Sequence, residues 1–528
     1  MSAARWMTAA LLAAALLGPT SSRAQSDSAA AKVTPAAAVE KQPAAAPAPA
    51  ATAAKAPVAT ASGTQDECMT CHLDAETPEA LAYRHDIHRA RGVTCADCHG
   101  GDPHSDDQDA AMNKAKGFIG VPKKQRIPVL CGSCHGGQDS GFAARFKLKN
   151  VLADYHGSAH ERSLDANPKG AQCVSCHGVH NIVAVTDPKS PVHAGRVVDT
   201  CARCHGDALY MRDFNPTLPV DQKEKYLTSV HGQRNAKGDW KVATCVSCHS
   251  NHAILQVKDP RSPVYPTRIP ETCAHCHANQ KYMAGYNIPT TQYQDYRESV
   301  HGIALLKKSD LNAPACNSCH GNHGAAPPGV ASVTAVCGQC HQSNEELYQR
   351  SAHQPVFAEK KLPACVVCHG NHKVKPTSDA MIAFEKPAPC AACHKDDAGD
   401  KAAPAMRRIR GLIDSLTVGQ KDAEAILARA ENLGMDITDA RYSLKDARQS
   451  RVQSRVAIHS FVEKEFEEAA RPGIQVVAKA RAAGEAAIHE HRFRRQGLVV
   501  STLLVTFAAL LLWLKIRQIE RRQRGEDN

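Results

Sequence analysis

The chain has 528 residues and a formal net charge of +11, with 22 cysteines and 28 histidines against only 10 Phe, 11 Tyr and 3 Trp. Its length allows roughly three or four domains of about 150 residues, but the low aromatic content leaves few large apolar side chains and excludes conventional globular cores. The positive charge alone would suggest nucleic acid or anionic lipid as a partner.

Residues 1–24 are typical of a secretory signal peptide. Arg5 precedes an apolar run over about 7–17, and Ser22 and Ala24 supply the small residues of a cleavage site. A retained signal anchor is the alternative. Residues 25–63 are rich in Ala and Pro, so they bury too little apolar surface to fold, and we expect a disordered linker.

All the cysteines lie between residues 68 and 393, in eleven copies of Cys-x-x-Cys-His. At the background frequency of histidine, eleven matches in eleven have a chance probability on the order of 10⁻¹⁴. The motif attaches c-type haem, because its thiols bind the porphyrin covalently and its histidine ligates the iron. Zinc ribbons do not explain the histidine or the odd number of pairs, and a disulfide scaffold would not repeat one spacing. The sequence therefore predicts eleven covalently attached haems.

We number these predicted sites 1 to 11, each with two cysteines and a proximal histidine. In chain order they are Cys68/Cys71/His72, Cys95/Cys98/His99, Cys131/Cys134/His135, Cys173/Cys176/His177, Cys201/Cys204/His205, Cys245/Cys248/His249, Cys273/Cys276/His277, Cys316/Cys319/His320, Cys337/Cys340/His341, Cys365/Cys368/His369 and Cys390/Cys393/His394. Together they predict an undecahaem cytochrome domain over residues 64–398. Its porphyrin faces are expected to replace the missing aromatic side chains as the apolar interior.

Ten further histidines recur at fixed places between the sites. A Tyr-x-x-Ser-x-His signal follows each odd site up to site 9 and ends at His160, His231, His301, His353 and, in a looser first copy, His88. Each even site is followed closely by His104, His180, His252, His323 or His372. The pattern divides the region into five two-haem units plus a terminal haem.

These ten histidines are the predicted distal ligands, because neutral imidazole binds iron well. A hydrogen bond to a haem propionate is the alternative for any one of them. Ligation by two histidines fills the iron's coordination sphere, which suits electron transfer rather than substrate binding. The spacing does not say which histidine serves which haem.

Site 11 has no repeat histidine of its own. The candidate ligand is His459, or one of the unassigned histidines His85, His156, His193 and His275. Of these, His193 is the weakest, because the parallel repeat segment has Tyr265 in its place. An open position at site 11 would permit an enzyme acting on nitrite, hydroxylamine or a sulfur compound.

Residues 400–495 are predicted to form a helical hairpin or stalk. Apolar residues at helical spacing run from Met406 to Ala430, interrupted by Gln420, and Gly434 ends this helix. A second helix is expected over about 437–470, broken at Arg471-Pro472-Gly473 before a third that leads to the membrane. The segment either positions or dimerises the haem domain, or covers the last haems as a lid.

Residues 497–516 are predicted to be a transmembrane helix, because Gly497–Leu514 carries no charge and is nearly long enough to span a bilayer. Basic residues on both sides are more numerous after the span, which favours a cytoplasmic tail over residues 517–528. Haem attachment outside the cytoplasm requires the same orientation. A buried soluble helix is the alternative.

Haem reverses the sign of the net charge. Two propionates on each of eleven haems turn +11 into about −11 when the irons are reduced, so nucleic-acid binding has no support.

With these motifs in view, the chain resembles bacterial multihaem c-type cytochromes with doubled Cys-x-x-Cys-His motifs, similar to class III cytochromes c and their larger membrane-anchored relatives. The resemblance covers about residues 68–394. The chain differs from pentahaem nitrite reductases in that no Cys-x-x-Cys-Lys occurs in it. The resemblance implies a mainly α fold with little regular secondary structure in the haem region.

The expected function is electron relay on the periplasmic side of the bacterial inner membrane, in anaerobic respiration. A quinol-oxidising membrane partner would donate electrons, and periplasmic or outer-membrane redox proteins would accept them. No separate substrate site is expected, a multihaem oxidoreductase being the alternative. Donor, acceptor, direction of flow and dimerisation stay open.

Overall fold

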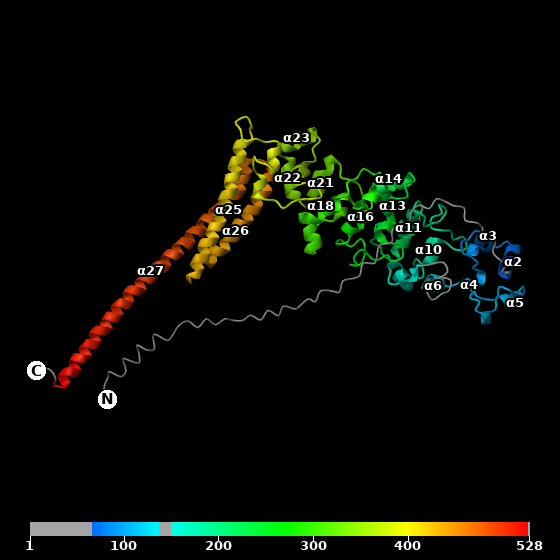
Figure 1. Ribbon diagram of the computed structural model, residues 1–528, viewed down its shortest axis with the longest axis horizontal. Coiled ribbons are helices and arrows are strands. Elements are labelled where there is room, and N and C mark those ends of the chain that lie inside the picture. Colours follow the sequence, from blue (N-terminus) through cyan, green and yellow to red (C-terminus); the bar gives the residue numbers. More distant parts are fainter. Residues whose placement is uncertain (1–65, 137–148, 526–528) are drawn as a thin grey trace. The chain divides into compact units, whose positions relative to one another are not determined.

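The computed structural model describes residues 66–136 and 149–525 (Figure 1). The predicted signal peptide and linker, residues 1–24 and 25–63, lie outside these residues. Helices make up the secondary structure of the described chain, and no strand occurs in it. The predicted mainly α fold class is confirmed.

The helices between residues 66 and 398 are short and joined by long connections. The even sites lie on α4 (Cys95–His99), α10 (Cys173–His177), α15 (Cys245–His249), α20 (Cys316–His320) and α24 (Ala364–His369). The odd sites lie on or beside α2 (Glu67–Asp74), α6 (Ile127–His135), α11 (Val197–His205), α16 (Ile269–His277), α21 (Val333–Gly338) and η7 (Pro389–Ala392).

The other elements of this region connect the sites or carry the distal histidines. The α-helices are α3 (Pro78–Tyr83), α5 (Gln108–Ala111), α8 (Val151–Tyr155), α9 (Ala159–Ala166), α12 (Ala208–Arg212), α13 (Gln222–Thr228), α14 (Val230–Ala236), α17 (Gln280–Met283), α18 (Gln292–Glu298), α19 (Val300–Gly302), α22 (Gln342–Gln349) and α23 (His353–Glu359). Single turns are η1 (Arg89–Arg91), η2 (Lys114–Lys116), η3 (Lys124–Arg126), η4 (Ile303–Lys307), η5 (Val330–Ser332) and η6 (Asp379–Met381).

The even-site helices stop at their proximal histidine for a backbone reason. The next residue has a positive φ, for example 80° at Gly178 and 70° at Ser250. Glycine takes this conformation without steric cost, and it terminates a helix. The chain therefore turns away directly after the proximal histidine, and the following histidine lies in a separate loop.

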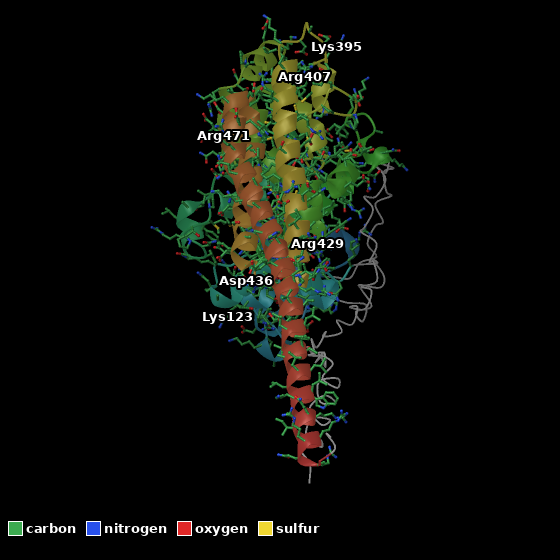
Figure 2. All side chains as sticks on the ribbon, turned by 90° about the vertical axis from the view of Figure 1, so that its left-hand side faces the viewer. Lys123, Lys395, Arg407, Arg429, Asp436 and Arg471 are labelled. Atoms are coloured by element: carbon green, nitrogen blue, oxygen red, sulfur yellow. The ribbon has the colours of Figure 1, made fainter. Side chains whose placement is uncertain are left out.

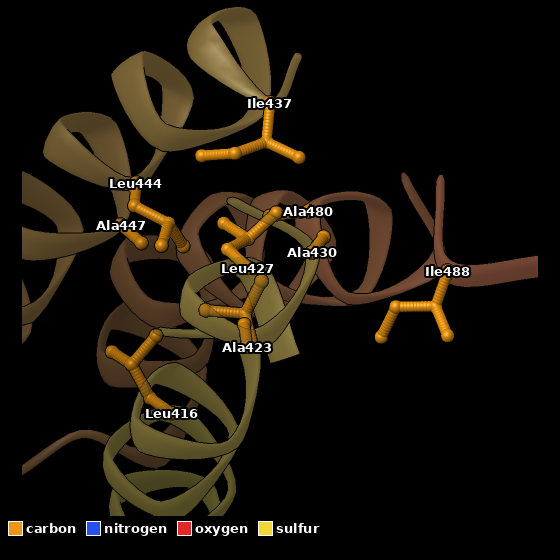
Figure 3. Close-up of a cluster of buried hydrophobic side chains, with 10 residues drawn as sticks. Leu416, Ala423, Leu427, Ala430, Ile437, Leu444, Ala447, Ala480 and Ile488 are labelled. Atoms are coloured by element: carbon orange, nitrogen blue, oxygen red, sulfur yellow. The ribbon is translucent and has the colours of Figure 1, made fainter. Parts of the chain in front are cut away.

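A three-helix bundle follows, made of α25 (Ala403–Asn432), α26 (Thr438–Ala457) and the first half of α27 (Glu463–Gln523). Its core joins Leu416 and Leu427 of α25 to Leu444 of α26 and Val477 of α27, and much of this cluster appears in Figure 3. Charged side chains such as Arg407, Arg429 and Arg471 stand on the outside (Figure 2). The apolar face predicted for the first helix is buried as expected, and Gln420 is buried within it.

The break predicted at residues 471–473 is wrong, because α27 continues through Pro472. The chain turns earlier. α26 ends at Ala457, the turn η8 (Ile458–Ser460) follows, and Phe461 has a φ of 53°. The hydroxyl of Ser460 accepts a hydrogen bond from the Val462 N–H (3.2 Å) and fixes this turn.

A side chain of α26 hydrogen-bonds the backbone of α27 on both sides of Pro472. The Ser450 hydroxyl accepts from the Gly473 N–H (3.0 Å) and donates to the Ala469 carbonyl (2.8 Å). These two groups would otherwise bond directly in a regular helix, a pairing that a proline disturbs. Gly473 is needed there, since a Cβ would lie 2.6 Å from that of Ser450.

Ser450→Ala is expected to destabilise the bundle by about 1–3 kcal/mol, because it leaves two buried backbone groups without partners. The measurement is the loss of helical circular dichroism of the haem-loaded protein on heating. Ser443→Ala is the matched control, since that hydroxyl donates only to the Ala440 carbonyl of its own helix (2.8 Å). Equal losses from both variants would contradict the bridging role of Ser450.

Within the described residues, one helix is long and apolar enough to cross a membrane, and it is α27. The mean hydropathy of its most apolar 18-residue window is 2.3, and none of that window is buried. Its earlier part packs into the bundle through residues from Phe466 to Ile488. Since α27 runs unbroken from Glu463 to Gln523, the last helix of the stalk, the candidate span and the start of the tail lie on one helix, and the predicted domain boundaries stay predictions.

The bundle also contacts the last haem sites. Arg350, after site 9, makes a bidentate ion pair with Glu465 of α27 (2.7 and 2.8 Å), and Asp379 pairs with Arg455 of α26 (2.6 Å). The rings of His353 and Phe461 lie 3.9 Å apart. Near the last haem sites the bundle therefore makes the contacts expected of a lid. Beyond the bundle, α27 continues as expected of a stalk.

Candidate haem sites

Ten of the eleven proximal histidines face a second imidazole, with ring centroids 5.9–6.3 Å apart. At the even sites the pairs are His99–His180, His177–His252, His249–His323, His320–His372 and His369–His459. At the odd sites they are His135–His88, His205–His160, His277–His231, His341–His301 and His394–His353.

This separation fits a haem iron between the rings. A metal at about 2.0 Å from one nitrogen of each imidazole places the ring centroids about 6 Å apart. Rings in direct contact lie closer, as the 4.5 Å between His193 and Trp240 shows. The 22 cysteines, all within the described residues, are free of disulfides, so both thiols of each motif are available for attachment. The residues present therefore fit bis-histidine haem at ten sites.

The paired histidines come from neighbouring units, each unit holding one odd and one even site. The histidine after an odd site faces the odd site of the next unit, as His160 of unit 2 faces His205 of unit 3. The histidine after an even site faces the even site of the previous unit, as His252 of unit 3 faces His177 of unit 2. Adjacent units therefore exchange imidazoles in both directions.

A repeated backbone hydrogen bond accompanies the exchange. In each case the donor is the N–H of the residue before a histidine of the Tyr-x-x-Ser-x-His signal. The acceptor is the carbonyl of the second residue after a histidine that follows an even site. The four bonds are Ile87 to Ile182 (2.8 Å), Ala159 to Ile254 (2.7 Å), Val230 to Ala325 (3.1 Å) and Val300 to Val374 (2.9 Å). Each bond joins two successive units, so it fixes both distal loops at their shared boundary.

The Tyr-x-x-Ser-x-His signal has structural roles that the sequence did not disclose. The tyrosine hydroxyl donates to the carbonyl two residues before the next even site, at Tyr83 (2.8 Å), Tyr155 (3.0 Å), Tyr226 (2.9 Å) and Tyr296 (2.8 Å). The serine caps the turn that carries the histidine, as Ser229 accepts from the Gly232 N–H (2.9 Å). The sequence feature that could have indicated these roles is the recurrence of the tyrosine and the serine at one spacing.

The cysteines connect the sites into one series. Within a unit, the first cysteines of the two sites lie close together, in the pairs Cys131–Cys173, Cys201–Cys245, Cys273–Cys316 and Cys337–Cys365. Between units, burial and then the neighbouring thiols of Cys273, Cys245 and Cys276 raise the pKa of Cys248 to about 11, which marks their proximity. The same proximity relates Cys98 to Cys134, Cys176 to Cys204, Cys319 to Cys337 and Cys368 to Cys390.

The motif cysteines are less buried than the expected apolar interior would suggest. Every first cysteine is half-buried, whereas the second cysteine is exposed at five sites, namely Cys71, Cys98, Cys319, Cys340 and Cys393. The chain itself therefore does not enclose these five cysteines. The reason is that a helix of one or two turns brings few side chains over its own end.

Site 9 also departs from a motif held within one helix. α21 ends at Gly338, so Cys340 and His341 follow it in a turn, where both N–H groups donate to the Cys337 carbonyl (3.2 and 3.0 Å). Burial and then the thiols of Cys337 and Cys340 raise the pKa of Cys319, which indicates that the exposed Cys340 lies near site 8. Cys340 thus keeps its place in the series, although it is neither helical nor buried.

Hydrogen bonds orient several of the imidazoles. Nδ1 of His99 and of His459 lies 2.8 Å from the Gly120 carbonyl and 3.0 Å from the Val456 carbonyl, which holds the proton there and leaves Nε2 for a metal. Burial, followed by the charge of His205, lowers the pKa of His160 to about 4. This ring is therefore neutral at physiological pH, as a metal ligand must be.

His88 has a carboxylate partner that the sequence analysis missed. Asp86 replaces the serine of the other repeats and lies 2.8 Å from Nδ1 of His88. It also accepts from the Ile182 N–H of the next unit (2.7 Å). Burial alone would raise the pKa of Asp86, but these hydrogen bonds outweigh burial and lower it. A carboxylate in this position strengthens an imidazole ligand.

The structure changes two expectations about individual histidines. His459 faces His369 of site 10, so the expectation that it serves site 11 is wrong, and His353 faces His394 there. Among the described residues, His72 of site 1 and His104 face no second imidazole. The unassigned His85, His156, His193 and His275 likewise form no imidazole pair, and His193 is buried against Trp240.

Comparison with known proteins agrees with this geometry. The family described as Cytochrome c3 matches residues 87–206. The multiheme cytochrome MtrA of Shewanella baltica is 26% identical over 294 residues, which cover 49% of this chain and 77% of that protein. The C-type polyheme cytochrome OmcC of Geobacter sulfurreducens is 24% identical over 201 residues, 35% of this chain and 20% of that protein. No solved structure matches the chain significantly.

The paired imidazoles, the free motif cysteines and these matches together define a multihaem c-type cytochrome. The chain is similar to MtrA and OmcC over part of its length, and electron transfer is its general function.

Proposed function

We propose that the chain carries eleven c-type haems and relays electrons along them between redox proteins at the periplasmic face of the bacterial inner membrane. The observation that carries this proposal is the set of ten imidazole pairs, 5.9–6.3 Å apart, on sites that follow one another in chain order. When bound, a bis-histidine haem supplies a one-electron carrier with no free coordination position.

The chain's own residues would hold and insulate these carriers. The motif cysteines would attach each haem and the proximal histidine would ligate its iron. The facing histidine would come from a neighbouring unit at sites 2 to 9, from the last unit at site 11 and from the bundle at site 10, and the tyrosine and serine of the repeat would position the histidines that face odd sites. Exchange of ligands between units would keep successive haems close, since the haems of sites 2 to 9 would each be held by two units at once. An unbroken relay follows from this arrangement.

The candidate span and the basic residues after it support an inner-membrane anchor with the haem domain in the periplasm. From Glu463, next to the last haem sites, to Gly497 the continuous α27 is about 50 Å long. Membrane quinol would therefore not reach these haems directly. The electron donor is proposed to be a quinol-oxidising membrane protein whose own redox centre projects from the bilayer, and the acceptors to be periplasmic or outer-membrane proteins. The helical stalk is also the proposed contact surface of a homodimer.

Quinol reduction of purified protein and of native membranes tests the relay. We expect quinol to reduce the haems quickly in membranes and slowly in the purified detergent-solubilised protein, with speed restored by a co-purifying b-type, iron–sulfur or molybdenum subunit. The readout is the c-type haem absorbance. Equally fast reduction of the purified protein would contradict the need for a partner.

A further inference from the structure

Among the described residues, His72 of site 1 is the proximal histidine that no second imidazole faces, while the ten others are paired. By the pattern at the other odd sites, His72 would pair with a histidine that follows the odd site of a preceding unit. Residues 1–71 contain no histidine. By the same pattern, His104 would face the even site of a preceding unit rather than its own.

The geometry around site 1 agrees with this reasoning. His72 and His104 are both exposed, whereas nine of the ten paired proximal histidines are partly buried, His341 of site 9 being the exposed one. The His104 loop is anchored at the start of α2, where the Glu67 N–H donates to the Pro103 carbonyl (2.8 Å), while His72 lies towards the other end of that helix. Asp102 holds the loop through the His104 N–H (3.0 Å) and Lys116 (2.7 Å).

The opposite end of the series is closed differently. There the bundle supplies His459 in place of the next unit, at 6.1 Å from His369. His353 completes site 11, which removes the open position that the sequence suggested there. Site 1 is therefore the remaining place in the series where an iron would have one imidazole.

We propose that the haem on Cys68, Cys71 and His72 keeps its sixth iron position open and binds a small nitrogen- or oxygen-donor molecule of the nitrite or hydroxylamine class. This inference rests on the proposed attachment of haem at all eleven motifs. The adjoining site 2 connects this haem to the rest of the series, because α2 packs against α4.

Electron paramagnetic resonance of the oxidised full-length protein tests the open position. We expect about one haem in eleven to be high-spin and to become low-spin on adding cyanide. His104→Ala should leave this signal unchanged, while the matched variant His180→Ala, which removes the ring facing His99, should add a second high-spin haem. A wholly low-spin protein that gains a high-spin haem only in His104→Ala would overturn the proposal, because His104 would then close site 1.

Removal of single haems locates the signal. Cys68→Ala with Cys71→Ala should remove one haem and the high-spin signal together, whereas Cys390→Ala with Cys393→Ala should remove one haem and keep the signal. The reverse result would place the open position at site 11 and overturn the assignment. Haem content distinguishes the two proposals, since fewer than eleven haems in the unmodified protein contradicts the proposed function, whatever the spin state.

Discussion

His459→Ala is expected to convert the haem of site 10 from low-spin to high-spin. His459 supplies the ring that faces His369 at 6.1 Å, and its Nδ1 lies 3.0 Å from the Val456 carbonyl, which fixes the orientation of the ring. The expected change is a new high-spin signal from about one haem in eleven, together with slower electron passage between sites 9 and 11. Absorbance and electron paramagnetic resonance of the oxidised protein measure the spin state.

Two further variants sharpen this test. His459→Met should keep the haem low-spin and raise its reduction potential, because thioether ligation favours the reduced iron. His489→Ala, at an exposed position of α27, should change neither property. If His459→Ala left the spectrum unchanged, or if its new signal disappeared when Cys390 and Cys393 were both replaced, the assignment to site 10 would be wrong.

The ten paired sites are expected to give two classes of low-spin signal. At the even sites the two ring planes are nearly parallel, at angles of 11° to 23°. At the odd sites they are tilted by 38° to 89°. Parallel imidazole planes separate the iron orbitals in energy, whereas crossed planes leave them nearly equal, which moves the resonance to a larger g value. The axial ligands thus give the haems two alternating electronic states.

Matched variants assign the two classes. His231→Ala removes a tilted ring (54°) and should weaken the large-g class, while His252→Ala removes a parallel ring (12°) and should weaken the other class. A single class of signals, or loss of the same class in both variants, would contradict the alternation.

The helical tail shows where sequence patterns were sufficient and where they failed. The apolar face of α25 was predicted from its spacing, because a buried helix face must repeat every three to four residues. The break at Pro472 was predicted wrongly. The rule that proline ends a helix considers that helix alone, whereas here the Ser450 hydroxyl of another helix hydrogen-bonds the backbone on both sides of Pro472. A long-range hydrogen bond of this kind leaves no local signal.

By itself, the sequence determined the eleven attachment motifs, the ten recurring histidines, the division into units and the candidate membrane span, because covalent attachment, ligand chemistry and hydrocarbon thickness each require particular residues at fixed local spacing. Only the tertiary structure decided which histidine faces which site. Each distal ring comes from a neighbouring unit and is placed by bonds such as Ile87 to Ile182, across almost a hundred residues. For that reason the site without a second imidazole is site 1, where the exchange of rings between units begins. The repeat spacing had pointed to site 11 instead.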